Sequence, residues 1–159
     1  MRQQGVTLLQ MMCALTIGSL LTHLGITAYA RLGETLQLAA AARELAQALR
    51  AARNQAALQQ LALTVHPLQG DWGKGWRVSQ EHDGQVLREH RLAKPVKVVA
   101  SSAREVRFSK RGAPIGEGFV GITLDICQRS GPGSQHQVVL SPSGRVSLRS
   151  DEGRRCAGD

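Results

Sequence analysis

Residues 1–30 read MRQQGVTLLQMMCALTIGSLLTHLGITAYA, and the organisation of the whole chain follows from this start. A short polar leader with one arginine ends at Gly5, and the 25 residues from Val6 to Ala30 contain no Asp, Glu, Lys or Arg. About 20 mainly apolar residues in a helix suffice to cross a bilayer. Scattered Thr, Ser, Gln, His and Gly make this segment insert less firmly than a permanent anchor. We therefore expect a membrane-spanning helix over 6–30 that later packs against other helices.

Two other interpretations of this start remain open. Arg2, the apolar run and Ala28-Tyr29-Ala30 also fit a secretory signal that is cleaved after Ala30 and releases a secreted β domain. Against it, the apolar run exceeds the ~7–15 residues of a typical signal. The helical pattern also continues past Ala30. An ordinary N-terminal membrane anchor is the second alternative.

The next segment predicts an amphipathic continuation of the same helix. Residues 34–60 are rich in Ala, Leu, Gln and Arg, which are good helix formers, and contain no Pro or Gly. Apolar residues recur at steps of four and three, which places them on one helix face: Leu38, Ala42, Leu45, Leu49, Ala52 and Ala56. A polar stripe has the same steps: Arg43, Gln47, Arg50 and Asn54. We expect helix to about Leu61, with 31–61 as its amphipathic half.

Beyond that point the pattern predicts strands. Short runs with β character alternate with turn signals; the runs are 61–65, 76–79, 85–88, 96–99, 105–108, 121–126, 137–140 and 144–148. The turn signals are Asp83-Gly84, Arg111-Gly112, Gly131-Pro132-Gly133 and Pro142-Ser143-Gly144. The predicted fold is therefore α+β, with an antiparallel β domain over 62–159 packed on the amphipathic face of one N-terminal helix.

The net charge and the cysteines limit the functions and the compartment that the chain can have. The 159 residues carry a formal net charge of +8, with the cations dispersed from Arg43 to Arg155. This favours a solvated basic surface, with phosphate, anionic lipid or an acidic partner as sharper interpretations. Cys13 lies in the apolar run and is expected to act as a small hydrophobe. If the β domain lies outside the cytoplasm, Cys127 and Cys156 can form a disulfide.

Catalysis finds little support in the sequence. The five histidines have no metal-site spacing, and neither Gly-x-Ser-x-Gly nor a Walker-type loop occurs. We predict a protein that is not an enzyme and has no metal or cofactor. Residues 71–76, DWGKGW, predict a turn whose two tryptophans cap the core, with an exposed aromatic contact as the alternative.

Late arginines offer one further candidate site. Arg145 and Arg149 lie on a predicted strand and are followed by Arg154 and Arg155. They fit either the wet edge of a polar hairpin or contacts to DNA phosphates.

The chain resembles the FimT/FimU/GspH group of type IV minor pilins and pseudopilins over essentially its full length. Residues 5–10, GVTLLQ, are similar to the family pattern Gly-Phe-Thr-Leu-x-Glu, with Val6 in place of Phe and Gln10 in place of Glu. AARNQA at 51–56, WGKGW at 72–76 and SGRV at 143–146 also resemble family segments. The segments DWGKGW and DIC, at 125–127, are most similar to FimU-like members.

The resemblance implies a role and a set of sites. It implies cleavage by prepilin peptidase between Gly5 and Val6, N-methylation of Val6, and a Cys127–Cys156 disulfide. It also implies a single pass through the inner membrane, a periplasmic C-terminal domain, and later a place in the pilus. There the chain would join the major pilin and other minor pilins, prime assembly and sit at or near the tip.

One departure, at Gln10, and two other branches matter for that role. In the family, the Glu at mature position five pairs with the N-terminal amine of a neighbouring subunit; Gln10 can hydrogen-bond to an amine but cannot neutralise it. This implies a specialised subunit. The FimT branch implies DNA binding through Gly-Arg-x-Arg, of which residues 144–147, GRVS, keep only the first arginine. The GspH branch implies a type II secretion pseudopilin.

Overall fold

The computed structural model describes residues 8–101, 105–116, 118–128, 133–150 and 154–156, without the side chains of 27, 31, 133–135, 154 and 155. The chain divides into two compact units, residues 1–36 and 37–159. The predicted cleavage site at Gly5 and Val6 lies outside the described residues, as does most of the predicted turn at 131–133.

One helix, α1 (Leu8–Gln59), runs through both units. In the first unit its large apolar side chains are exposed, from Leu8 and Leu9 to Leu36. By length and composition, α1 is long and apolar enough to cross a membrane. Gln10 and the free Cys13 lie on this part of the helix and are exposed.

In the second unit the predicted apolar stripe of α1 is confirmed as its core-facing side. All six predicted residues are at most 3% exposed: Leu38, Ala42, Leu45, Leu49, Ala52 and Ala56. The helix ends because Gln60 adopts a left-handed conformation (φ 53°). The Leu61 amide then donates to the Ala56 carbonyl at 3.1 Å, the closing bond of a Schellman C-cap.

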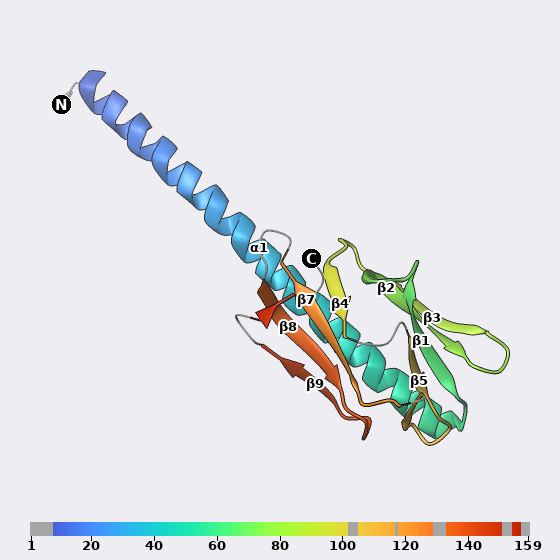
Figure 1. The fold of residues 1–159 in the computed structure, drawn as a ribbon. Helices are drawn as coiled ribbons and strands as arrows, with labels where there is room; N and C mark the ends of the chain where they lie inside the picture. The colour runs from blue at the N-terminus through green and yellow to red at the C-terminus, as the bar shows by residue number, and fades with distance from the viewer. Residues whose placement is uncertain (1–7, 102–104, 117, 129–132, 151–153, 157–159) are drawn as a thin grey trace. The chain divides into compact units, whose positions relative to one another are not determined.

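Two antiparallel sheets pack on this half of the helix (Figure 1). The first has the order β3-β2-β1-β5-β6, and its strands are β1 (Leu63–Leu68), β2 (Asp71–Gln80), β3 (Val86–Arg91), β5 (Val106–Phe108) and β6 (Pro114–Ile115). The second has the order β10-β8-β7-β4, with β9 also paired to β8. Its strands are β4 (Lys97–Ala100), β7 (Ile122–Cys127), β8 (Gly133–Leu140), β9 (Val146–Arg149) and β10 (Arg154–Arg155).

Both sheets and the helix stripe share one hydrophobic core. The first sheet contributes Leu63, Val65 and Phe108, and the second contributes Ile122, Leu124, Ile126, Val138 and Leu140, all at most 1% exposed. Leu, Val and Ile dominate this core, as an aromatic content of 3% requires. The predicted α+β fold is confirmed. The strands β6 and β10 were not predicted, because a strand of two residues has no detectable period.

The prediction of a turn over 71–76 is wrong, although its core role is confirmed. The segment begins strand β2, and the turn lies just before it at Gln69 (φ 55°) and Gly70 (φ 76°). Trp72 and Trp76 are only 4% and 3% exposed. Gly73 lies against the Val96 carbonyl oxygen, so a Cβ there would collide with backbone. Gly73 therefore lets the segment just before β4 lie close against β2.

Candidate functional site

A disulfide fastens the end of the chain to the second sheet. Cys127, the last residue of β7, is bonded to Cys156, with a Cα–Cα distance of 6.2 Å. Just before Cys156, Arg154 and Arg155 pair with Ser134 and Gly133 of β8. The predicted disulfide is confirmed, and it holds β10 at the edge of the second sheet.

Near the end of α1, one arginine side chain joins a turn from each sheet. Arg53 Nε donates to the Gly112 carbonyl oxygen at 3.2 Å, in the turn between β5 and β6. The same nitrogen would lie 3.0 Å from a Cβ at Gly144, in the turn between β8 and β9. Both glycines have positive φ, 74° and 80°. We call Arg53, Gly112 and Gly144 the Arg53 junction.

A second arginine of α1, Arg50, also binds the backbone close to the β8–β9 turn. Arg50 Nη2 donates to the Val146 carbonyl oxygen at 3.0 Å, at the start of β9. Sequence reasoning placed Arg50 on a polar stripe and assigned Arg53 no role. The available signal was the spacing of the two arginines, since residues i and i+3 lie side by side on a helix.

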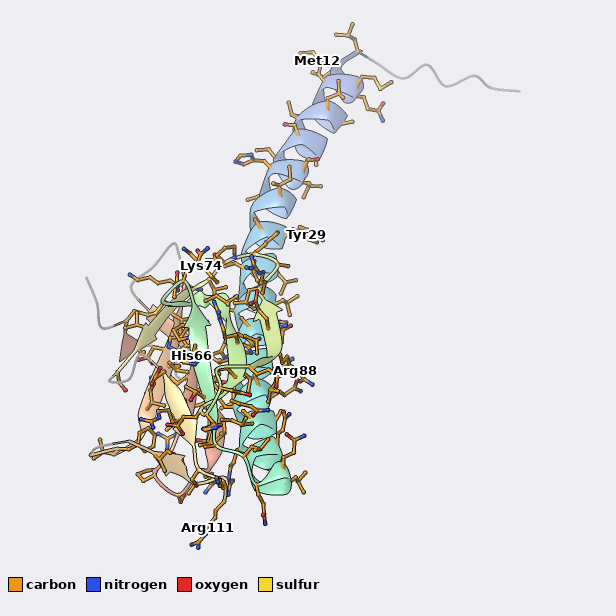
Figure 2. The ribbon with its side chains drawn as sticks, turned by 90° about the vertical axis from the view of Figure 1, so that its right-hand side faces the viewer. Met12, Tyr29, His66, Lys74, Arg88 and Arg111 are labelled. Atoms are coloured by element: carbon orange, nitrogen blue, oxygen red, sulfur yellow. A yellow bond between two sulfur atoms is a disulfide. The ribbon has the colours of Figure 1, made fainter. Side chains whose placement is uncertain are left out.

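Three exposed cations surround the Arg53 junction. Lys110 and Arg111 precede Gly112, and Arg145 follows Gly144. Within the part of the chain that the structure describes, their side chains make no hydrogen bond or ion pair. Figure 2 shows Arg111 near the last turns of α1, with its side chain directed away from the sheets.

An exposed apolar residue, Val120, lies next to the β8–β9 turn, which ends at Arg145. Val120 is 83% exposed. Its neighbour Gly121 lies against the β8–β9 turn, where a Cβ would be 3.5 Å from Pro142 Cδ. We call Lys110, Arg111, Val120 and Arg145 the basic end surface.

The four arginines predicted as candidate DNA contacts are spread along the length of β8. Arg149 is the last residue of β9 and pairs with Gln137, whereas Val146, directly after Arg145, pairs with Leu140 at the end of β8. Arg154 instead pairs with Ser134, six residues earlier on β8. At ~3.3 Å per residue the two pairing positions are about 20 Å apart. The structure therefore brings Arg145 to Lys110 and Arg111 rather than to β10.

Two histidines bind neighbouring carboxylates beside surface hollows. His66 Nδ1 lies 3.1 Å from Glu105 Oε2, in the hollow on the outer face of β1 and β2. His90 Nε2 lies 3.0 Å from Glu44 Oε2 in the hollow between α1 and β3, and its ring stacks on Trp76. These contacts tie elements together. Among the described residues, no group of three or more His, Cys, Asp or Glu side chains could hold a metal.

One histidine has a shifted pKa. Burial lowers the pKa of His136 on β8 below its ordinary value of 6.5, and the positive charge of Arg43 on α1 lowers it further. Both causes favour the neutral ring.

Comparisons with known proteins agree with this architecture. Residues 41–144 match the family described as type II transport protein GspH. A crystal structure of the type IV minor pilin FimU of Pseudomonas aeruginosa superposes with a TM-score of 0.63 and 27% identity, covering 77% of this chain and 97% of that chain. Another crystal form of FimU gives a TM-score of 0.58 and 26% identity, covering 74% and 98%. No curated protein sequence matches the chain.

These matches concern structural subunits that assemble with other pilins, and the apolar half of α1 suits a membrane-anchored member of that kind. The family is one of structural proteins rather than enzymes. Since the family match spans well over half of the 159 residues and the fold is that of FimU, the chain belongs to the GspH family of minor pilins and pseudopilins.

Proposed function

We propose that this protein is a minor type IV pilin that helps to prime pilus assembly and sits at or near the filament tip. The observation that carries the proposal is the likeness to FimU, a type IV minor pilin, which covers 97% of the FimU chain. The disulfide between Cys127 and Cys156 supports it, because the resemblance to FimU-like members implied that pairing.

The apolar segment and the β domain would have different locations before and after assembly. Before assembly, residues 6–30 would hold the chain in the inner membrane, with the head, 62–159, in the periplasm. Prepilin peptidase would cut between Gly5 and Val6, and Val6 would be N-methylated. On assembly the apolar helix would exchange lipid for neighbouring helices. Its exposed leucines would then never meet water, so extraction avoids the hydrophobic cost.

Gln10 favours a specialised subunit. A carboxylate at mature position five costs about 2.5–3.5 kcal/mol in the hydrocarbon region unless it is paired, and Gln10 avoids that cost. The subunit would therefore depend less on pairing with a neighbour's N-terminal amine. We expect Gln10→Glu to increase incorporation along the filament, measured by immunogold labelling. Even labelling of both proteins along filaments would contradict this role.

Deletion of the gene tests the proposal directly. We expect far fewer surface pili by electron microscopy, restoration by the wild-type gene, and gold label at filament ends. Normal pilus number, with protein secretion lost, would instead support the second candidate. That candidate is a pseudopilin of a type II secretion system, and the description of the matching family favours it.

A DNA-binding role for natural transformation is the remaining alternative. It would rest on Arg145, Arg149, Arg154 and Arg155, with Lys110 and Arg111 as additional cations near Arg145. A gel shift at two salt concentrations tests it, because phosphate contacts weaken steeply as salt rises. Absence of a shift at low salt, or a shift unaffected by Arg145→Ala and Arg149→Ala, would remove this role.

A further inference from the structure

We propose that the basic end surface (Lys110, Arg111, Val120 and Arg145) is a docking face for a neighbouring pilin subunit that presents carboxylates around an apolar contact. This inference rests on the proposed function, because it names where and how one partner would bind.

The basic end surface carries cations that no residue of the described chain neutralises. Lys110, Arg111 and Arg145 are exposed, and their side chains have no hydrogen bond or ion pair within the described part of the chain. The described residues of the three turns, 109–116, 118–121 and 141–145, include no Asp or Glu. The acidic Glu117 lies outside the described residues. Three cations against at most one carboxylate leave a positive surface that fits an acidic partner.

The backbone beneath these cations is held in place by α1. The Arg53 junction ties the β5–β6 turn to α1 through the bond to Gly112, and the β8–β9 turn packs on the same guanidinium through Gly144. Arg50 adds a bond to Val146 directly after Arg145. Since the two turns rest on one rigid helix, little main-chain entropy would be lost when a partner binds.

Val120 distinguishes a protein partner from a nucleic acid. Among the described residues of 37–159, only Leu58 and Val120 are large apolar side chains more than four-fifths exposed. The adjacent Phe119 is half-buried and packs on the core, so the backbone beside Val120 is anchored. A phosphate backbone offers no apolar surface to cover a valine, whereas protein interfaces combine an apolar centre with a charged rim.

Binding of purified full-length subunits in detergent tests the proposal. The probes are the major pilin and the other minor pilins of the source organism, each titrated against this chain at two salt concentrations. The test variant combines Lys110→Glu, Arg111→Glu and Arg145→Glu. A matched control combines Lys74→Glu, Arg88→Glu and Lys94→Glu, three exposed cations whose reversal changes the net charge equally.

We expect at least one pilin to bind the wild-type chain, with the test variant weakening Kd by about tenfold or more and the control by about twofold or less. Val120→Asp alone should also weaken binding, because it removes the apolar contact and repels carboxylates. Retained tryptophan fluorescence of Trp72 and Trp76 would show that each variant is folded.

Three results would overturn the inference. Equal weakening by test and control variants would reduce it to an effect of net charge. Loss of duplex DNA binding in the test variant, with pilin binding retained, would assign the surface to DNA. Pilin binding that neither variant weakens would place the interface elsewhere and leave the proposed function intact. If no pilin bound even the wild-type chain, the proposed function itself would fail.

Discussion

Arg53 Nε donates to the Gly112 carbonyl oxygen at 3.2 Å, and this bond fastens a turn of the first sheet to the helix. The second sheet reaches the same guanidinium through Gly144, where a Cβ would be 3.0 Å from Nε. Two segments that resemble the family, residues 51–56 and 143–146, therefore meet in space. Their shared role is to join both sheets to α1.

Gly144→Ala should destabilise the head more than Gly84→Ala does. Both glycines have positive φ, at 80° and 69°, so each alanine costs about 1–2 kcal/mol of backbone strain. A Cβ at Gly144 would also press on Arg53 and Pro114, whereas a Cβ at Gly84 meets nothing within 4 Å. Denaturation followed by tryptophan fluorescence measures both. Equal losses would show that the Arg53 junction contributes nothing.

Gly73→Ala should be among the most damaging substitutions in the chain. The added Cβ would collide with the Val96 carbonyl oxygen, and that backbone is held because the Val96 amide donates to the Gly73 carbonyl at 3.0 Å. We expect a loss of about 3 kcal/mol or more, as in severe overpacking. The neighbouring exposed Lys74→Ala should stay within about 0.5 kcal/mol. A stable Gly73→Ala protein would mean that β2 does not approach Val96 this closely.

Removing the disulfide should lower stability while leaving the core strands in place. Cys127 and Cys156 are 29 residues apart, and the chain-entropy model assigns such a loop about 3–4 kcal/mol. Cys156→Ala should show this loss in denaturant titrations, and Cys13→Ala should not, because Cys13 is free. Identical unfolding of wild-type protein with and without reductant would contradict the prediction.

His136 should make the head less stable in mild acid. Because the folded-state pKa lies below 6.5, the unfolded chain takes up a proton first as pH falls. Stability contributed by the neutral ring is present above about pH 6.5 and is lost as pH falls from there to the lower folded-state pKa. His136→Gln should therefore show a smaller drop in unfolding midpoint between pH 7.5 and 5.5. An equal drop in both proteins would exclude this role.

Periodicity predicted the elements whose pattern of apolar residues repeats several times along the sequence. The six-residue stripe from Leu38 to Ala56 and the alternation in β7 depend on local spacing, which one sequence displays fully. The turn predicted over 71–76 was wrong, because the glycines there serve approaches from Val96 and His90 rather than chain reversal. Such approaches come from residues distant in sequence and leave no local pattern.

The candidate surface was predicted only in part. Arg145 was named from the sequence, but Lys110 and Arg111 were not, because their proximity to Arg145 depends on both turns resting on Arg53. Arg154 and Arg155, close in sequence, instead pair with the far end of β8. Sequence distance was therefore a poor guide to which cations share a surface.

N-terminal mass spectrometry of the mature protein decides whether this chain is processed as a pilin. We expect a first residue of N-methylated Val6 in wild-type cells, and retention of the leader in a Gly5→Leu variant. A mature protein that begins at Arg31 would contradict this expectation and identify a secreted domain cleaved after Ala30.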